Sequence, residues 1–419
     1  MTRSEFDRKY TSQLNPQQLA AVHAVDGAVL LLAVPGSGKT TVLVTRLGYM
    51  LCCCGISPDA ILTMTYTKAA TREMQKRFVR LFGQDCPQVP EIRTINGVSS
   101  KIIDFYARTH GSGSAFTVVE NEGELAKIVS DLYRELSGEF ATQSVIKELR
   151  KGIAYVKNMM LGKEDLGELD TGFDQFPELY AQYNLALRQR RWMDYDDQMI
   201  YAKTILENYP DILAYFQDAF PYICVDEAQD TSKIQHIIIG LLAGEQGNLF
   251  MVGDEDQSIY GFRLARPELF LEKYHAYPSE PGEDGPNLKI ELHQNFRSRD
   301  TVLTGINDIF YRIMTENLGN IRYTEDAALH PGAVVAEAKE PDRVGGLSEL
   351  LMVNTGDEAL SGLDEYEEMI SEKLPIEKRK LLDMARILTN NPKLIMMDEV
   401  MAGLNPIEME ESIRFVKKV

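Results

Sequence analysis

The chain has 419 residues, 44% of them hydrophobic, which is enough for two or three domains with sizeable cores. Its formal net charge of −19 argues against indiscriminate nucleic-acid binding, so any such contact must use a local basic surface. We find no signal peptide and no apolar run of membrane-spanning length, and we therefore expect no membrane insertion and a cytoplasmic location.

The first informative helix begins within residues 14–18, where Pro16 suits the first turn of a helix. Gln18 lies shortly before a glycine-rich segment. A glutamine at such a place can read adenine, because one side-chain amide both donates and accepts hydrogen bonds. Surface glutamines are common, so this signal is weak by itself.

Residues 28–41 predict a strand, a glycine-rich turn and a helix that begins at Lys39. The apolar residues 28–33 are typical of a strand buried on both faces. The N–H groups of the turn and the positive end of the helix dipole would together hold a phosphate. We expect Lys39 to reach the β- and γ-phosphates and the Thr40 hydroxyl to bind Mg²⁺. A chance glycine turn is the alternative, but strand, turn and helix agree. The predicted nucleotide-binding residues are Ala33, Val34, Pro35, Gly36, Ser37, Gly38, Lys39, Thr40 and Thr41.

A second buried strand is predicted at residues 60–66, followed by a helix over residues 68–82 and another after Thr94–Gly97. The helix over 68–82 carries cations that form either a solvated face or part of a basic surface: Arg72, Lys76, Arg77 and Arg80. Three adjacent cysteines precede it and cannot supply metal-ligand spacing on one helix face. We interpret them as small buried apolar side chains: Cys52, Cys53 and Cys54.

Residues 106–190 are mainly helical in pattern, and strands return at 220–225, 249–253 and 288–292. The loop at 278–286 is rich in proline, glycine and acid and resembles a domain linker. The first of these strands ends in Asp226 and Glu227. We expect it beside the strand of the phosphate loop, where Asp226 would hold Mg²⁺ and Glu227 would polarise the attacking water.

Several ordered motifs resemble the UvrD/Rep family of superfamily 1 DNA helicases over residues 10–335. They are Gln18, Thr65–Thr67, Asp226–Thr231, Val252–Arg263 and Gln294–Ser298. The resemblance implies an α/β fold with a P-loop, RecA-like parallel sheet flanked by helices, a helical insertion and an incomplete second α/β portion. It also implies a 3′→5′ helicase or translocase that uses ATP and Mg²⁺ on single-stranded DNA or DNA with a 3′ tail. The implied domains are residues 1–105 and 191–277 for the ATP-binding domain, 106–190 for the insertion and 287–335 for the start of a second motor domain.

The resemblance also assigns roles to individual residues. Gln18 would read adenine and Phe296 would stack on it. Gln257 would sense the γ-phosphate, and Arg297 would contact it with support from Arg263. The residues that would contact DNA are Thr65, Tyr66 and Phe262, the two aromatic rings by stacking on bases. Packing in the core is the alternative for both rings.

Residues 345–419 resemble the C-terminal half of an ABC transporter ATPase, with a second Asp-Glu pair at Asp398 and Glu399 but no second phosphate loop. We therefore expect a truncated helicase joined near residues 336–350 to a truncated ABC fragment. A divergent second motor domain is the alternative. Such a chain would bind ATP, hydrolyse it slowly and not unwind duplex DNA alone, unless a partner chain supplied the missing lobe. The competing functions are a nucleotide-binding remnant without unwinding activity and an ABC-type transport ATPase.

Overall fold

The computed structural model describes residues 1–111, 116–244, 247–254, 266–279, 287–313, 323–325 and 328–332. The chain divides into two compact units, Met1–Val335 and Ala336–Val419, and every described residue lies in the first. The predicted ABC-like segment 345–419, with Asp398 and Glu399, lies outside the described residues. Gln257, Phe262 and Arg263 do as well.

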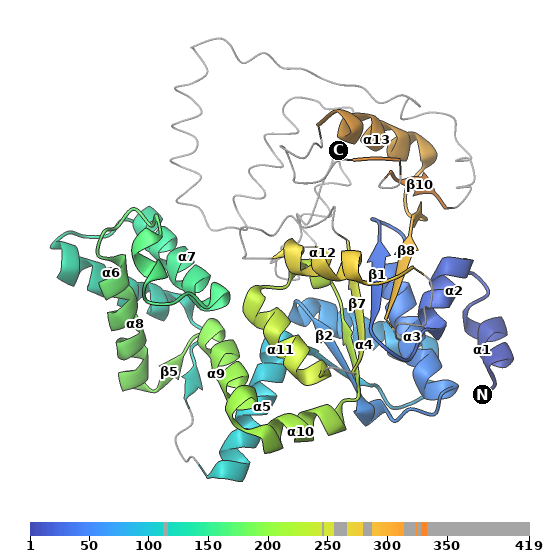
Figure 1. The fold of residues 1–419 in the computed structure, drawn as a ribbon, viewed down its shortest axis with the longest axis horizontal. Helices are drawn as coiled ribbons and strands as arrows, with labels where there is room; N and C mark the ends of the chain where they lie inside the picture. Colours follow the sequence, from blue (N-terminus) through green and yellow to red (C-terminus); the bar gives the residue numbers. More distant parts are fainter. Residues whose placement is uncertain are drawn as a thin grey trace, which may run out of the picture. The chain divides into compact units, whose positions relative to one another are not determined.

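The first unit is built on a six-stranded parallel sheet with the strand order β3-β2-β6-β7-β1-β8 (Figure 1). The strands are β1 (Val29–Ala33), β2 (Ile61–Thr65), β3 (Glu91–Thr94), β6 (Tyr222–Val225), β7 (Asn248–Gly253) and β8 (Leu288–Leu292). The predicted α/β class with a parallel sheet flanked by helices is confirmed. Because all six strands run in one direction, their carboxyl ends share one edge of the sheet, where α/β proteins bind ligands.

Side chains alternate between two cores, one on each face of the sheet. Leu30, Met64 and Met251 belong to one core, whereas Leu31 and Phe250 belong to the other. Successive side chains of a strand point to opposite faces, so a strand covered on both faces must be apolar throughout. This explains the continuous apolar run that the sequence shows at β1.

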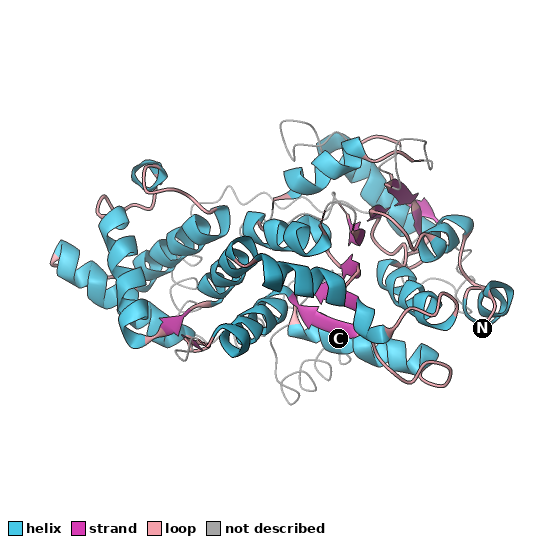
Figure 2. Cartoon of the chain, turned by 60° about the horizontal axis from the view of Figure 1, so that its bottom comes forward, coloured by secondary structure: helices cyan, strands magenta, loops and turns pink. Residues whose placement is uncertain are grey.

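Helices cover both faces of the sheet, as Figure 2 also shows from a second direction. One face carries α1 (Arg3–Tyr10), α2 (Pro16–His23), α3 (Lys39–Cys52) and α4 (Lys68–Phe82). The other carries α5 (Ile95–His110), α9 (Tyr195–Asn208), α10 (Pro210–Ala219), α11 (Lys233–Ala243) and α12 (Pro267–Ala276). The predicted beginnings of α2, α3 and α4 and the predicted end of α4 are confirmed.

Three further helices pack on one another around a separate core: α6 (Glu122–Ser137), α7 (Gln143–Met159) and α8 (Phe176–Arg190). Two short paired strands accompany them, β4 (Thr117–Val118) and β5 (Trp192–Met193), which the sequence pattern did not reveal. After the sheet come β9 (Gln294–Asn295), α13 (Asp300–Ile313) and β10 (His330–Pro331), which pairs with β9.

A buried charge cluster joins the three-helix group to α9 of the sheet-covering layer. The Lys157 ammonium group on α7 lies 2.6 Å from Asp194 and 2.7 Å from Asp197. Tyr183 of α8 donates a hydrogen bond to Asp194 at 3.0 Å. Burial alone would lower the pKa of Lys157, but the two carboxylates outweigh it and raise that pKa. The lysine therefore stays charged and ties three helices together.

Two predictions about strand placement are wrong. The strand at 288–292 was assigned to the second motor portion, but β8 pairs with β1 along its whole length and completes the first sheet. Residues 280–286 of the predicted linker lie outside the described residues, but the chain on either side belongs to the same sheet and its covering layer: α12 packs on the sheet and β8 is one of its strands. The strand ending in Asp226 was expected beside β1, but β7 lies between them. The apolar pattern of β6 fits a position beside β1 as well as its actual position beyond β7, because both positions are internal and covered on both faces.

The interpretation of the adjacent cysteines is also wrong. Cys54 is exposed, Cys53 is half-buried, and Cys52 forms a disulfide with Cys86. Helix α3 ends at Cys52, so the next two cysteines lie in the turn beyond it rather than on its buried face. The chain after α4 returns to this turn and brings Cys86 to Cys52.

Candidate nucleotide-binding site

The glycine-rich turn links β1 to α3 at the carboxyl edge of the sheet. Two backbone positions require glycine, since Gly36 has φ +73° and Gly38 has φ +89°, both in the left-handed region. Lys39 is the first residue of α3, whose first N–H groups have no partner within the helix. The Ser37 hydroxyl is buried and has no hydrogen-bond partner among the residues that the structure describes. The turn thus holds the donors that a phosphate group needs.

Two carboxylates face this turn from the end of β6. The Lys39 ammonium group lies 3.5 Å from the Glu227 carboxylate. Burial raises the pKa of Asp226 to about 7, and the neighbouring Glu227 adds to the rise while Lys39 opposes it. A carboxyl group with a raised pKa is one that a cation would stabilise in its ionised form.

Glu227 is held in a particular conformation. Its backbone has φ +51°, a left-handed value that costs a non-glycine residue of order 1–3 kcal/mol. The Gln229 side chain donates a hydrogen bond to the Glu227 carboxylate at 2.8 Å and accepts one from the Asp254 backbone at 3.1 Å. Gln229 is buried, so it fixes Glu227 relative to the end of β7.

Gln18 joins α2 to the turn. Its side-chain nitrogen donates a hydrogen bond to the Ser37 carbonyl at 2.7 Å, and its oxygen accepts one from the Asn15 backbone at 3.0 Å. Gln18 is buried, so both ends of its amide are used within the protein in this structure. Contact with adenine would require it to exchange one of these bonds.

Asn295 joins the turn to the segment after β8. Its side-chain nitrogen donates a hydrogen bond to the Pro35 carbonyl at 2.7 Å. Its oxygen accepts hydrogen bonds from the backbone N–H groups of Arg297 at 2.8 Å and Ser298 at 2.9 Å. A Cβ atom on Gly36 would lie 2.7 Å from the Asn295 side chain, so this close approach also requires glycine.

Phe296 and Arg297 consequently lie next to the phosphate turn. The Phe296 backbone N–H donates a hydrogen bond to the Gly36 carbonyl at 3.0 Å. The Phe296 ring is half-buried, and the Arg297 side chain is exposed. The predicted nucleotide residues from β1, α2, β6 and this segment are therefore brought together around one turn.

The residues at this turn fit a magnesium–nucleotide complex. Among the described residues no three His, Cys, Asp or Glu side chains gather into a metal cage. Mg²⁺ needs no such cage, because it is usually held by one or two carboxylates together with phosphates and water. Thr40 and Asp226 would hold the ion, while Ser37 and Lys39 would hold phosphate oxygens.

Two of the predicted DNA-contacting residues lie at the end of β2, at the same edge of the sheet: Thr65 is the last residue of the strand and Tyr66 follows it. Thr65 is buried, and its hydroxyl is hydrogen-bonded to that of Thr71 at 2.6 Å. The Thr65 side chain therefore supports the turn before α4 and is not exposed to contact a DNA strand. Tyr66 is half-buried.

Three residues of the site were not singled out from the sequence. Asn295 lies within a motif that the sequence analysis quoted, yet only its neighbours received a role. Gln229 likewise lies within the acidic motif after β6. Arg77 donates a hydrogen bond to the Thr41 hydroxyl at 2.5 Å, whereas the pattern grouped it with the other cations of α4. Helical position gives no clear signal, because Arg77 is three residues from Arg80 and residues three apart are neighbours on a helix surface.

Comparisons with known proteins identify a family to which this chain is similar. A family described as the UvrD/REP helicase N-terminal domain matches residues 14–278. A protein named ATP-dependent DNA helicase PcrA from Leuconostoc citreum is 30% identical over 304 residues, 71% of this chain and 39% of the relative. Proteins of the same name from Staphylococcus aureus strain Mu50 and Staphylococcus epidermidis are 32% and 33% identical over 302 and 300 residues, covering 71% of this chain and 40% of each relative. The chain spans about two fifths of the length of these relatives. In the described part of the chain, no helix has the length and apolar character to cross a bilayer.

Proposed function

We propose, because this chain belongs to the UvrD/REP helicase N-terminal domain family, that it binds and hydrolyses ATP with Mg²⁺ and couples hydrolysis to movement on single-stranded DNA. Relatives that bear the name ATP-dependent DNA helicase support this function. The observation that carries it is the arrangement at the phosphate turn, where Lys39 of α3 and Glu227 after β6 lie 3.5 Å apart.

In the proposed reaction, the N–H groups at the start of α3 and the Lys39 ammonium group hold the phosphates of ATP. Bound Mg²⁺ would supply charge stabilisation for the transferred phosphoryl group. Glu227 orients the attacking water and accepts its proton, and Gln229 keeps the carboxylate in place. Arg297, with Gln257 and Arg263, would stabilise the charge that develops on the γ-phosphate.

The proposed substrate is single-stranded DNA, or DNA with a 3′ tail, with movement in the 3′→5′ direction as the family resemblance implies. Tyr66 and Phe262 would stack on bases, a contact worth about 1–3 kcal/mol per base. Thr65 would support this contact by shaping the turn before α4. We also propose a cytoplasmic location.

The ABC-like character of residues 345–419 is a separate proposal that rests on the sequence motif alone. Asp398 and Glu399 have no phosphate loop of their own in the sequence, so we propose that they take no part in catalysis. Changing them to Asn and Gln should keep ATPase activity within about twofold, which is a barrier change below roughly 0.5 kcal/mol. A larger loss would show that this pair, rather than Asp226 and Glu227, serves the phosphate turn.

Two substitutions test the proposed chemistry. Lys39→Ala should abolish detectable ATP binding, because it removes the cation that faces the phosphates. Glu227→Gln should leave binding intact and abolish turnover, because an amide cannot accept the proton. Lys127→Ala and Glu139→Gln, both exposed on or after α6, are the matched controls.

Fluorescent-nucleotide binding and phosphate release, each with and without single-stranded DNA, measure both effects. ATP binding by Lys39→Ala at the unchanged affinity would contradict the nucleotide site. Unchanged turnover by Glu227→Gln would remove Glu227 from the reaction. An ATPase rate that single-stranded DNA leaves unaltered would contradict the coupling to DNA.

A further inference from the structure

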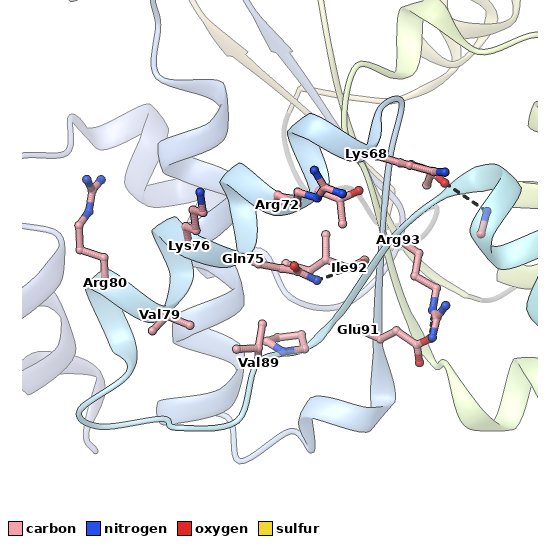
Figure 3. Close-up of a pocket in the computed structure, with 14 residues that line it drawn as sticks. Lys68, Arg72, Gln75, Lys76, Val79, Arg80, Val89, Glu91, Ile92 and Arg93 are labelled. Carbon is pink, nitrogen blue, oxygen red and sulfur yellow. Dashed lines mark hydrogen bonds and ion pairs between the residues drawn. The ribbon is translucent and has the colours of Figure 1, made fainter. Parts of the chain in front are cut away.

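A groove of about 1010 Å³ lies at the β3 edge of the sheet, between α4 and the segment that forms β3. Figure 3 shows Lys68, Arg72, Lys76 and Arg80 following one another along α4. The opposite wall comes from residues 89–94. The nucleotide-binding turn is not among the residues that line this groove.

The groove has a strong excess of positive charge. Arg72, Lys76 and Arg80 are exposed, and within the described part of the chain they make no ion pair and no side-chain hydrogen bond. Glu91, the one carboxylate among the described lining residues, pairs with Lys101 at 2.5 Å and also with Arg93. These cations are left to attract an anion from solution, although the whole chain is acidic.

The spacing of the cations fits a periodic polyanion. Lys68, Arg72, Lys76 and Arg80 recur every fourth residue, so neighbouring cations are separated by about 6 Å along the helix axis. The row from Lys68 to Arg80 spans about 18 Å, so its four cations can each meet one phosphate of an extended single strand. An acidic protein segment shows no such fixed charge period unless it is itself helical.

The groove also has exposed apolar side chains, and two helices begin at one of its ends. Val79 is 52% exposed and Val89 is 36% exposed, which offers apolar surface to sugars and bases. Helix α4 begins two residues after Tyr66, and α5 begins directly after Thr94 at the same edge of the sheet. The positive ends of both helix dipoles therefore lie where the groove begins.

We propose that this groove binds the phosphates of a single DNA strand beyond its contact with Tyr66. The groove extends the binding site by about four nucleotides along α4, one for each cation of the row. This inference rests on the proposed function, since it assumes that a strand reaches Tyr66. An acidic peptide is the other polyanion to consider, and both the cation spacing and the exposed valines favour a nucleic-acid strand over it.

The test uses the full chain carrying Arg72→Gln, Lys76→Gln and Arg80→Gln together. Its matched control carries Arg8→Gln, Lys127→Gln and Lys147→Gln, which remove the same charge from exposed positions on α1, α6 and α7. Glutamine has a helix propensity close to that of lysine and arginine, so all the helices are preserved. Binding of oligothymidylates of increasing length is measured by fluorescence anisotropy at several salt concentrations.

The groove variant should stop gaining affinity at a length about three nucleotides shorter than the unsubstituted chain, one for each cation removed. Its plot of log K against log salt should be shallower by about 2, because three lost phosphate contacts each account for about 0.7 in a single strand. The control variant should match the unsubstituted chain in both measurements. Nucleotide binding should be the same in all three proteins.

The inference would be overturned if the groove variant and the unsubstituted chain had the same length dependence and the same salt slope. In that case, DNA binding that still depends on Tyr66 would leave the proposed function standing. Absence of DNA binding by the unsubstituted chain at every length would overturn both. Poly-glutamate that binds through the three cations, where oligothymidylate does not, would replace the strand with an acidic peptide and also overturn the inference.

Discussion

Replacing Asn295 with alanine tests whether the phosphate turn and the segment bearing Phe296 and Arg297 act as one unit. Asn295 is 4% exposed, and its side chain donates one hydrogen bond to Pro35 and accepts two from the backbone of Arg297 and Ser298. Alanine removes all three bonds while leaving the backbone of β9 in place.

The expected magnitude follows from these contacts. Each hydrogen bond contributes about 1 kcal/mol net, and an acceptor left without a partner costs about 1–3 kcal/mol. Arg297 is exposed, so water can satisfy its N–H group, whereas the Pro35 carbonyl loses a partner close to the turn. We therefore expect Asn295→Ala to lower the free energy of unfolding by about 2–3 kcal/mol. Loosening of the turn should weaken ATP binding by about tenfold, equivalent to roughly 1.4 kcal/mol.

Asn307→Ala is a matched control for the same chemistry at a different place. The Asn307 side chain also donates one hydrogen bond, to the Leu329 carbonyl, and accepts two, from the Leu329 backbone and the Tyr323 hydroxyl. The control should lose comparable stability without changing the ATP affinity. Urea unfolding and fluorescent-nucleotide titration measure the two quantities separately.

Two results would refute this reasoning. ATP affinity within about twofold of the unsubstituted chain for Asn295→Ala would mean that the turn keeps its shape without the asparagine. An equal loss of ATP affinity in Asn307→Ala would mean that the effect reflects general destabilisation rather than the contact with Pro35.

Three further predictions concern buried charge. Lys157→Met should lower the free energy of unfolding by about 3–5 kcal/mol, because it leaves two buried carboxylates unpaired. Adding Asp194→Asn and Asp197→Asn should recover most of that loss, as measured by urea unfolding. Burial raises the pKa of Asp196 to about 6, so the folded chain binds more protons than the unfolded chain between about pH 4 and pH 6, and stability falls as pH rises through that window. Asp196→Asn should abolish this fall, so the free energy of unfolding at pH 7 relative to pH 4 should rise by up to about 3 kcal/mol. An unchanged slope of the free energy of unfolding against pH would contradict this prediction. Arg46→Lys should lower the free energy of unfolding by about 2–4 kcal/mol, because an ammonium group cannot replace the planar guanidinium that donates hydrogen bonds to carbonyl groups at the end of α2. A melting temperature equal to that of the unsubstituted chain would disprove this prediction.

The sequence by itself determined the features that depend on neighbours along the chain. The strand, the left-handed glycines and the helix beginning at Lys39 follow from a short pattern, as do the bounds of α4. The acids at the end of β6 were recognisable because they directly follow an apolar run. These features are local, since backbone conformation and side-chain period act over a few residues.

Only the tertiary structure decided which distant segments meet. The position of β7 between β6 and β1, and the place of β8 in the first sheet, depend on strand order, and similar apolar strands could occupy any internal position. The bond from Asn295 to Pro35 joins residues 260 positions apart. Likewise, Arg77 turns toward Thr41 while Arg72 borders the groove, and the charges alone do not distinguish them. The sequence records the kinds of side chain at the site, but their partners are set by packing that brings distant residues within hydrogen-bonding distance.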